Sequence, residues 1–494
     1  MTPDSLPLAP LVERIRPLLP EIGQPVHLVG GVVRDALLGR ASHDVDLIVA
    51  ADAVPLTYWL ADRLRLPAYA LDAARDVGRI VAKAEATTLD IARYRGPTFE
   101  DDLRGRDFTI NALALPVGAR TAEAIIDRHG GLDDLRAGRI RAIHNDSIAD
   151  DPVRALRAAR FAAQLGFALT PETAEAARAA LPALLARTSA ERIRDELTKL
   201  LSAGEPHTGV ALLDELGLLA GVLPEVAALR DVAQSPPHHE AVLAHTVSVL
   251  RYLVAVEALL DGEPPDETAE WMEAVATLLA PYRAALRAHL ARAIEGGIDG
   301  QGLLRWGALY HDTGKRETQT VEETGRIRFL GHDEAGANLT AARLNRLNFG
   351  NAAIRHARAI VAGHMRPLYL ATERRAPSRR TIYRYYRALH EAGLDVALLS
   401  LADHLATYDG AGSGGEWEAL LTVVGALLAA YFDAPHEVVA PPRLLTGQDV
   451  MELLGQPPGH EIGRLLSLLE EAQAAGEVTT RGAAVTFIQE HASS

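Results

Sequence analysis

The chain has 494 residues, of which 48% are hydrophobic and 23% are charged, and its formal net charge is −15 at pH 7. This length and composition predict about three soluble domains, and the absence of cysteine excludes disulfides, thiolate metal sites and cysteine nucleophiles. Because neither a secretory leader nor an apolar run of about 18 residues is found, we expect a cytoplasmic protein without a membrane partner.

Short apolar stretches in the first 145 residues predict strands that are separated by turns and short helices. Residues 26–33 and 44–50 are rich in valine, leucine and isoleucine, and a short helix is expected between them from Arg34 to Leu38. Further strands are expected at 78–83, 88–94, 109–115 and 124–127. This part of the chain is therefore expected to be a mixed sheet with helices.

From Asp150 onwards the strand patterns end, and apolar residues recur at intervals of three and four, which predicts helices almost throughout. The expected fold class is therefore α+β, with an all-α remainder behind the N-terminal sheet. We expect four segments, namely a head at 1–145, a helical neck at 146–235, a helical domain at 236–410, and a linker and tail at 411–494. Residues 260–300 are interpreted as an insertion.

Two glycines and two aspartates in the head predict a phosphate and metal site. Gly30 and Gly31 let the backbone approach a triphosphate beside a helix N-terminus. Asp44 and Asp46 are two positions apart on a predicted strand, so both carboxylates face the same side and suit Mg²⁺. The chemistry implied is attack of a hydroxyl on an α-phosphate. Taken alone, the aspartate pair equally fits a capping or turn role.

The full pattern GGVVRDALLGRASHDVD at 30–46 resembles the class II tRNA nucleotidyltransferase and bacterial poly(A) polymerase family, within the DNA polymerase β-like superfamily. The stretch EDDLRGRDFTINA at 100–112 is similar to the second motif of this family, with Gly105 in place of one arginine. The resemblance implies a polymerase-β-like nucleotidyltransferase head. It also implies nucleotide-binding roles for several residues, namely Arg34, Arg106, Asp107 and Asn111.

A third acidic residue, Asp90, lies where the family has a strand beside the two aspartates, so the resemblance implies that it completes the metal site. A simple strand-end role explains Asp90 equally well.

Residues 150–154, Asp-Asp-Pro-Val-Arg, predict the start of a helix. Asp151 and Arg154 are three positions apart and are expected to share one helix face. The resemblance implies that this acceptor and donor read the base of the incoming nucleotide, whereas an ion pair at a helix start is the alternative. Arg157 and Arg160 extend the same face towards phosphate or a base.

The connection after the Asp90 strand is short, since residues 93–100 lead directly into the second family motif. In the family, a flexible loop of about a dozen residues at this place accompanies addition of the complete CCA sequence, and its loss accompanies enzymes that stop after CC. A fixed pocket has one hydrogen-bonding specificity. We therefore expect CC addition, and the short connection also counts against poly(A) polymerase.

Histidines and aspartates between residues 238 and 410 form a second constellation, which resembles the HD phosphohydrolase superfamily. The residues concerned are His245, His311, Asp312, His332, His364 and Asp403. The resemblance implies a divalent transition metal site with phosphodiesterase, phosphatase or nucleotidase activity. Lys315 is expected to contact phosphate, and His238 and His239 are interpreted as loop residues outside the pattern.

Six arginines at 374–387 with interleaved tyrosines fit an RNA-facing surface and a solvated helix face equally well. The tail at 443–494 resembles the C-terminal segment that holds tRNA in the family, although a small helical cap is the alternative.

Together these patterns predict a magnesium-dependent tRNA nucleotidyltransferase that uses CTP, with ATP as a second candidate substrate and the oligomeric state left open. The alternatives are a poly(A) polymerase, an HD phosphohydrolase with a degenerate RNA-binding head, and a non-catalytic RNA-binding protein.

Overall fold

The computed structural model describes residues 6–40, 42–262, 269–295, 297–412 and 414–492. The described residues divide into two compact units. The first unit extends to Thr188 and includes Leu216–Leu218, whereas the second comprises Ser189–Glu215 and the described residues from Leu219 onwards. The division into four segments stays a prediction. Part of the expected insertion, at 263–268 and 296, lies outside the described residues.

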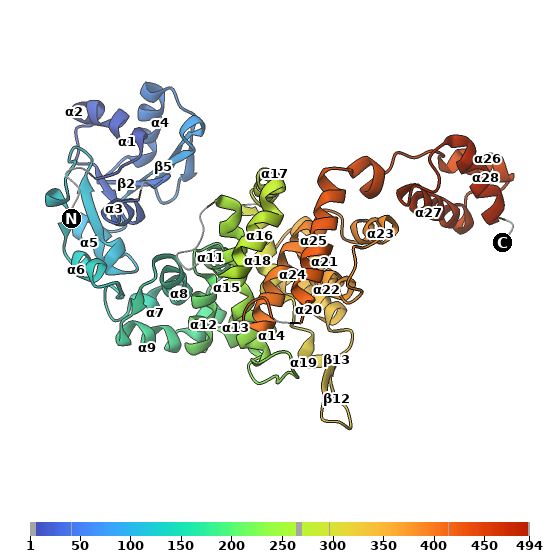
Figure 1. Ribbon diagram of the computed structural model, residues 1–494. Coiled ribbons are helices and arrows are strands. Elements are labelled where there is room, and N and C mark those ends of the chain that lie inside the picture. The colour runs from blue at the N-terminus through green and yellow to red at the C-terminus, as the bar shows by residue number, and fades with distance from the viewer. Residues whose placement is uncertain (1–5, 41, 263–268, 296, 413, 493–494) are drawn as a thin grey trace. The chain divides into compact units, whose positions relative to one another are not determined.

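A seven-stranded sheet with the order β3-β4-β5-β2-β1-β6-β7 forms the centre of the first unit (Figure 1). Its strands are β1 His27–Val29, β2 Asp44–Val49, β3 Ala68–Asp72, β4 Val77–Ala82, β5 Thr87–Arg93, β6 Leu113–Pro116 and β7 Ile126–Asp127. β2 and β5 are parallel, and the other pairs are antiparallel. The expected mixed sheet with helices is confirmed.

Three helices accompany the strands, namely α1 Pro10–Ile15, α3 Gly31–Leu37 and α4 Ala53–Leu64. Apolar residues of these helices and of the strands form one core. α4 and β3 were not predicted, although Leu56, Leu60 and Leu64 in α4 have the four-residue spacing of an amphipathic helix.

Three predicted strands are shorter than expected: the strand expected at 124–127 comprises only Ile126–Asp127, and two others lie close to the candidate site. The strand expected at 26–33 ends at Val29, because Gly30 has a φ of +76° and turns the chain directly into α3. The strand expected at 109–115 begins only at Leu113, because Thr109–Asn111 form a short 3₁₀ turn. With these two turns, Arg34 of α3 reaches the side chain of Asn111 and donates a hydrogen bond to it.

The neck part of the first unit is helical, as expected. Its helices are α7 Ser147–Asp150, α8 Arg154–Leu165, α9 Pro171–Ala179 and α10 Leu181–Arg187, whereas α2 Leu19–Ile22, α5 Phe99–Arg104 and α6 Gly131–Arg136 belong to the segment predicted as the head. The expectation that Asp151 and Arg154 share a helix face is wrong. Asp151 is extended, with φ −137° and ψ 92°, and lies between α7 and α8, because a residue before proline is disfavoured in the helical conformation.

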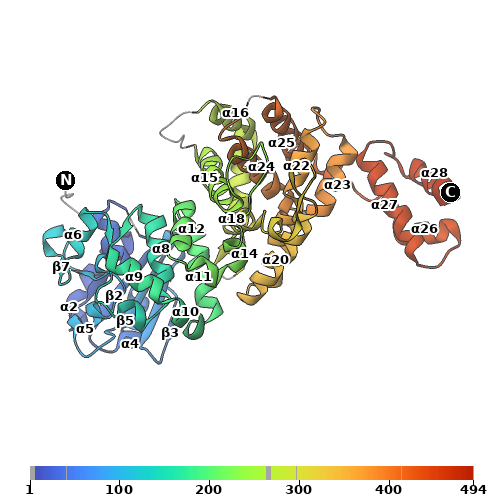
Figure 2. The same ribbon diagram turned by 90° about the horizontal axis from the view of Figure 1, so that it is seen from below.

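The second unit is a helical assembly in which α24 Ala392–Tyr408 is buried along almost its whole length (Figure 2). Around it pack α15 Val242–Asp261, α18 Gly300–Tyr310, α21 Asn351–Gly363, α22 Met365–Ala371, α23 Arg379–Leu389 and α25 Glu416–Phe432. Further helices are α11 Ala190–Leu201, α12 Pro206–Glu215, α13 Leu219–Val222, α14 Pro224–Ala227, α16 Glu270–Leu279, α17 Arg283–Leu290, α19 Lys315–Thr318 and α20 His332–Arg346. The tail comprises α26 Gly447–Leu454, α27 His460–Ala474 and α28 Arg481–Ala492, which share a small core.

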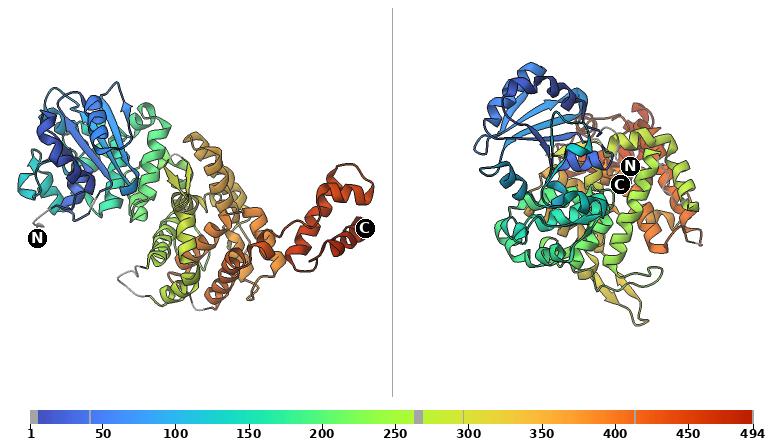
Figure 3. Two further views of the ribbon diagram at one scale, coloured as in Figure 1. Left: turned by 90° about the horizontal axis from the view of Figure 1, so that it is seen from above. Right: turned by 90° about the vertical axis from the view of Figure 1, so that its left-hand side faces the viewer.

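Two short hairpins interrupt the helices of the second unit and were not predicted. One pairs β10 Ala293–Glu295 with β11 Ile298–Asp299, and the other pairs β12 Gln319–Val321 with β13 Ile327–Phe329. The second hairpin extends away from the helices around it (Figures 1 and 3). The sequence carries a signal for it, since β-branched residues flank the turn residue Gly325.

Helix α15 is long and apolar enough to cross a membrane by length and composition alone. More than half of its most apolar window is buried inside the protein, and it carries the buried His245 and Glu257. Glu257 is paired with Arg305 of α18. These features are those of a core helix of the second unit.

A buried carboxylate joins three helices of the second unit. Asp395 of α24 is fully buried, and its two oxygens lie 3.1 Å from Nε2 of His289 in α17 and 2.8 Å from Nε2 of His356 in α21. Burial raises the pKa of Asp395, but the two histidines outweigh it and hold this pKa below its ordinary value.

Asp395→Asn is expected to lower the free energy of unfolding at pH 7 by about 1–3 kcal/mol, the typical cost of weakening a hydrogen bond to a buried charge. Because the folded pKa is depressed, the contribution of Asp395 is present above the unfolded pKa of about 3.9 and is lost as the pH falls through the folded value. Denaturant unfolding between about pH 6 and pH 2 checks this sign, because this range spans the unfolded pKa of about 3.9. A difference between wild type and variant that widened on acidification would contradict it.

Candidate active site and metal centre

The first candidate site lies in the head, where β2 and β5 run side by side. In β2, Asp44 and Asp46 are exposed and alternate with buried apolar residues, so the two carboxylates share one face of the sheet as expected. Asp46 is paired in register with Asp90 of β5, and Asp44 is paired with Thr88. Thr88 Oγ1 donates a hydrogen bond of 2.7 Å to Asp44 Oδ1. Three acidic residues are thus positioned by two neighbouring strands.

Asp46 is the electrostatically strained member of this group. Although it keeps accessible surface, the protein atoms around its carboxyl raise its pKa, and the neighbouring Asp90 and Asp44 raise it further, to about 6. Arg106 acts in the opposite direction. A divalent cation between these carboxylates would relieve their repulsion, so the donor set fits a hard metal ion.

Asp90 already has a protein partner. Arg79 of β4 donates two hydrogen bonds to its carboxylate, from Nε at 2.6 Å and from Nη2 at 2.7 Å. This pairing fixes the orientation of Asp90 beside Asp46 and compensates part of its charge. A role for Asp90 as a third metal ligand stays a prediction.

Gly30 is required where β1 turns into α3. A Cβ at this position would lie 3.1 Å from Arg106 Nη1 and 3.7 Å from Asp46 Oδ2, in addition to the strain of its positive φ. Gly31 begins the helix next to it. The missing side chain leaves the backbone open beside a carboxylate and a guanidinium, as the approach of a triphosphate requires.

The residues of the second motif form a buried chain of contacts. Arg34 Nη1 donates to Asn111 Oδ1 at 2.7 Å, and Asn111 Nδ2 donates to Asp107 Oδ1 at 3.0 Å. Asp107 in turn accepts from Arg157 Nε at 2.8 Å. Burial raises the pKa of Asp107, but Arg157 and Asn111 lower it to well below the ordinary value. Arg34 is therefore positioned by protein partners inside the site.

Arg106 and Arg160 are also held by protein groups. Arg106 forms an ion pair with the buried Asp102 at 2.8 Å. The guanidinium of Arg160 lies 4.1 Å from the ring centre of Phe161, and Arg34 and Arg157 approach the same ring at 5.1 and 5.4 Å. Phe161 was missed by the sequence reasoning. A lone phenylalanine in a helix gives no signal that three cations surround it.

Arg154 is anchored to the backbone. Its Nη2 donates to the carbonyl of Gly105 at 2.6 Å, and its Nη1 donates to the carbonyl of Arg106 at 3.0 Å and to Ser147 Oγ at 2.8 Å. Gly105, which replaces a family arginine, thus contributes its carbonyl to the placement of Arg154. The anchored guanidinium has a single preferred orientation.

The connection between β5 and α5 is short and ordered. β5 ends at Arg93 and α5 begins at Phe99, so only residues 94–98 lie between them. Thr98 and Asp101 form a reciprocal capping box at the start of α5, and the backbone N–H of Arg95 donates to Asp102 at 3.1 Å. Both ends of the connection at 94–98 are therefore fixed by hydrogen bonds.

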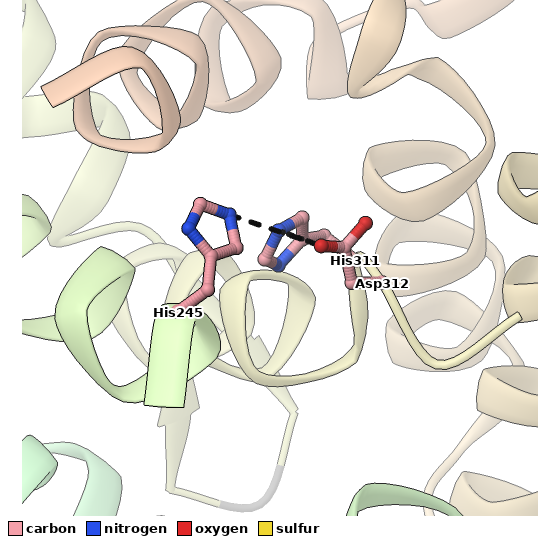
Figure 4. A group of neighbouring side chains, drawn as sticks. All are labelled: His245, His311 and Asp312. Atoms are coloured by element: carbon pink, nitrogen blue, oxygen red, sulfur yellow. Dashed lines mark ion pairs between the residues drawn. The ribbon is translucent and has the colours of Figure 1, made fainter. Parts of the chain in front are cut away.

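The second candidate site is a cluster of buried histidines and aspartates in the second unit. His245 Nε2 lies 3.0 Å from Asp403 and 3.8 Å from Asp312, and His311 Nε2 lies 3.2 Å from Asp312 (Figure 4). On the other side of Asp312, the Nε2 atoms of His332 and His364 lie 3.5 and 3.9 Å away. All six residues predicted from the sequence come together, and Asp312 lies between the two halves.

Three of the histidines are oriented by the backbone. The Nδ1 atoms of His311, His332 and His364 are 2.7–2.8 Å from the carbonyls of residues three positions earlier, and these carbonyls can only accept. The hydrogen bonds place the proton of each ring on Nδ1, so each Nε2 keeps a lone pair, and the Nε2 atoms of His332 and His364 lie 3.1 Å apart. Such outer contacts are typical of histidines that bind metals.

Two buried atoms of the cluster lack well-aligned hydrogen-bond partners, namely Nε2 of His311 and Oδ2 of Asp312. Burial, followed by His332 and His311, lowers the pKa of His364 to about 3, so its imidazole is neutral. Burial raises the pKa of Asp312, but His311 and Lys315 hold it well below its ordinary value. Burial lowers the pKa of His311, but Asp312 outweighs it and raises this pKa. A neutral imidazole such as that of His364 and an ionised carboxylate are suitable ligands for divalent transition metals.

Among the residues that the structure describes, two groups have ligand atoms within 4.8 Å of one another: His245, His311 and Asp312, and Asp312, His332 and His364. The three aspartates of the head are not such a group.

His238 was interpreted as a loop residue, but the structure places it at the metal centre. Its ring lies edge to face with His245, with 4.9 Å between ring centres, and it lines a cavity of about 570 Å³ together with Asp312 and Asp403. Gly314 was also missed. A Cβ there would lie 2.1 Å from the carbonyl of His332, so only glycine permits this approach of α20.

The arginine-rich stretch has acidic partners on neighbouring elements. Arg380 pairs with Glu477, Arg384 with Glu471, and Arg379 with Glu437. The structure therefore favours the helix face with paired arginines over an open RNA-binding surface.

Three family models match this chain. Residues 26–141 match the Poly A polymerase head domain, residues 166–229 match the probable RNA and SrmB-binding site of polymerase A, and residues 282–408 match the HD domain. His245 lies upstream of the HD match and reaches the cluster from α15.

Two relatives cover nearly the whole chain. An A-adding tRNA nucleotidyltransferase of Deinococcus radiodurans is 35% identical over 96% of this chain and 98% of the relative. A CC-adding tRNA nucleotidyltransferase of Thermus thermophilus is 32% identical over 93% of this chain and 92% of the relative. A Thermotoga maritima CCA-adding enzyme complexed with tRNA is similar in fold, with a TM-score of 0.55, 19% identity, and coverage of 97% of this chain and 94% of that structure.

Proposed function

This chain belongs to the tRNA nucleotidyltransferase family, and from this premise we propose that it adds two cytidines to the 3′ end of tRNA from CTP and then stops. The observation that supports the stop after two cytidines is the five-residue connection at 94–98, whose two ends are held by hydrogen bonds. Without a loop that moves, the pocket keeps one arrangement of hydrogen-bonding groups and therefore one base preference.

In this proposal Asp44 and Asp46 hold Mg²⁺ beside the α-phosphate, with Asp90 oriented next to them by Arg79. A metal ion held by these carboxylates would supply charge stabilisation to the attacking and leaving oxygens. Gly30 and Gly31 leave the backbone open to the triphosphate, and Arg106 supplies positive charge beside Asp46. The nucleophile is the 3′-hydroxyl of the tRNA.

We assign base selection to Asp151 and Arg154. Nη1 of Arg154 donates hydrogen bonds to backbone carbonyls and to Ser147, and one hydrogen of Nη2 is donated to a further carbonyl. The Nε–H and the second Nη2–H of Arg154 are therefore left to donate to the edge of a base. Asp151 lies three residues before Arg154, on extended backbone, and its carboxylate supplies the hydrogen-bond acceptor for the base. A donor edge that is held rigidly discriminates between bases because a wrong base leaves polar groups unpaired.

A second candidate is addition of the terminal A. The observation that favours it is the 35% identity with the A-adding enzyme of Deinococcus radiodurans over 98% of that protein.

Single-nucleotide incorporation separates the two candidates. The purified chain is given Mg²⁺ with CTP alone or ATP alone, on tRNA that ends at the discriminator base and on tRNA that ends in CC. We expect rapid use of CTP on the first substrate and no use of ATP on the second. Efficient addition of A to tRNA ending in CC would favour the alternative, and long A tails would favour poly(A) polymerase.

We further propose that the HD centre is a divalent metal site with phosphohydrolase activity, supported by the six converging ligands and by Lys315, whose Nζ lies 2.7 Å from Asp312. A transition metal suits the imidazole-rich set. Both activities fit an enzyme that acts on tRNA in the cytoplasm.

A further inference from the structure

One row of side chains crosses four strands of the head, from the proposed magnesium site to the edge of the sheet. Asp46 of β2 is paired in register with Asp90 of β5, which is paired with Arg79 of β4. Arg79 is in turn paired with Tyr69 of the edge strand β3. Because residues paired in register project from the same face of a sheet, Tyr69 shares the face of the acidic residues.

This face is accessible at β3, whereas the opposite face of the sheet is covered. Tyr69 is 46% exposed, and Leu71 of the same strand is 44% exposed. Helix α4 packs on the opposite face, since a Cβ at Gly78 of β4 would collide with the side chain of Thr57. An aromatic ring therefore stays exposed on the face that carries the acidic residues, where its burial by a ligand would be favourable.

Arg79 connects the tyrosine to the acidic residues. Its guanidinium donates two hydrogen bonds to Asp90. These bonds raise the pKa of Arg79 above its ordinary value although burial lowers it, and the side chain of Tyr69 raises it further. The phenol of Tyr69 thus lies beside the guanidinium, within the row that leads to Asp46.

The two sides of β2 carry different groups. The residues assigned to the incoming nucleotide lie towards β1 and β6, since Gly30 follows β1 and Asn111 precedes β6. The row through Asp90 and Tyr69 lies on the other side of β2. In an in-line displacement the attacking hydroxyl lies opposite the leaving pyrophosphate. The side of β5 is therefore left for the RNA strand that ends in this hydroxyl.

The distance from Asp46 to Tyr69 matches a short stretch of RNA. Three strand spacings separate β2 from β3, which amounts to roughly 14 Å at about 4.8 Å per spacing. Successive stacked nucleotides are about 3.4 Å apart, so this distance spans about four nucleotides when they are stacked and fewer when the strand is extended. The ring of Tyr69 is therefore within reach of the bases directly behind the terminal nucleotide.

We propose that Tyr69 positions the RNA substrate: its ring stacks on the unpaired base behind the terminal nucleotide and so aligns the 3′-hydroxyl with the metal site at Asp44 and Asp46. The inference rests on the proposed nucleotidyl transfer and names a group that holds the RNA for it. Stacking tolerates any base because every base has a flat face. Tyr69 therefore contributes to the alignment of the strand and not to the choice between CTP and ATP.

The test measures steady-state addition of cytidine to tRNA that ends in one C, with the full chain and Mg²⁺. Tyr69→Ala is expected to lower kcat/KM for the tRNA by about tenfold, the loss typical of one base-stacking contact. KM for CTP should stay unchanged, because the nucleotide lies on the other side of β2. Tyr69→Phe should keep wild-type activity. Tyr369→Ala, which removes an exposed tyrosine of the other compact unit, is the matched control and should also have no effect.

An unchanged kcat/KM for the tRNA in Tyr69→Ala would overturn the inference. A loss in Tyr69→Phe as large as that in Tyr69→Ala would also overturn it, because the effect would then arise from the hydroxyl beside Arg79 and not from stacking.

A binding measurement separates this inference from the proposed function. The tRNA that ends in one C carries 2-aminopurine as its discriminator base, whose fluorescence falls when the base stacks on a ring. The complex with the wild type is expected to fluoresce less than the complex with Tyr69→Ala. If cytidine is not incorporated but this difference is found, the proposed function fails and the inference stands. Equal fluorescence of the two complexes would refute the inference, whatever nucleotide the enzyme adds.

Discussion

Asp46→Asn is expected to reduce nucleotide incorporation into tRNA by at least about a thousandfold, because losing a metal ligand removes several kcal/mol of transition-state stabilisation and about 1.4 kcal/mol corresponds to a factor of ten. The effect arises from charge, since asparagine keeps the shape of the side chain on β2 and its exposed position. Burst or steady-state incorporation of labelled CTP measures it.

Two controls make this experiment specific. Asp62→Asn changes an exposed aspartate of α4, away from β2, and should leave incorporation unchanged. The Asp46→Asn protein should also keep the phosphohydrolase activity of the HD centre, which lies in the other compact unit. If incorporation survived in Asp46→Asn, Asp46 would not hold the metal and the head would have to be reassigned as an RNA-binding module.

Asp312→Asn is expected to weaken metal binding at the HD centre by more than about a hundredfold, beyond the about 10–100-fold effect of outer contacts. Asp312 lies between the two ligand groups, so both groups lose their shared carboxylate. Metal content after equilibration with Mn²⁺ or Ni²⁺ and removal of the unbound ion measures the loss. Addition of cytidine to tRNA should be unaffected.

Asp395→Asn is the matched control for this change. Asp395 lies on the same helix as Asp403, is equally buried and is also held by two histidines, but it belongs to neither ligand group. The Asp395→Asn variant should therefore retain its metal at temperatures where the protein is folded. Equal metal loss in both variants would mean that helix packing, rather than ligation, explains the effect of Asp312→Asn.

Local patterns predicted the parts of both sites that depend on residue type and spacing. The two-residue interval of Asp44 and Asp46 was sufficient because a strand alternates its faces whatever packs on it. The six residues of the HD centre were found because their order along the chain resembles the HD phosphohydrolase superfamily. The mixed sheet and the helical remainder followed from the periodicity of apolar residues.

Other features depend on contacts between residues that are distant in the sequence. His238 reaches the metal centre only because its loop packs beside α24, where Thr407 Oγ1 lies 3.5 Å from its Nδ1. Three arginines from two helices lie over the ring of Phe161, and no single stretch of sequence indicates this arrangement. The error at Asp151 was avoidable, because Pro152 disfavours a helical residue before it.

The arginines of α23 show why charge runs are ambiguous in sequence. Their partners lie about 60 to 100 positions later, in Glu437, Glu471 and Glu477, and only the folded chain brings them together. Net charge and local density of arginine therefore carry no information about which surface faces RNA.

The length of the product on tRNA that ends at the discriminator base tests the central claim most directly. The chain is incubated with Mg²⁺ and with CTP and ATP together, and products are resolved to single nucleotides at several enzyme concentrations. We predict that extension stops after two cytidines even with excess enzyme and ATP. A product that carries the complete CCA sequence would contradict the claim that the fixed connection at 94–98 restricts this enzyme to C.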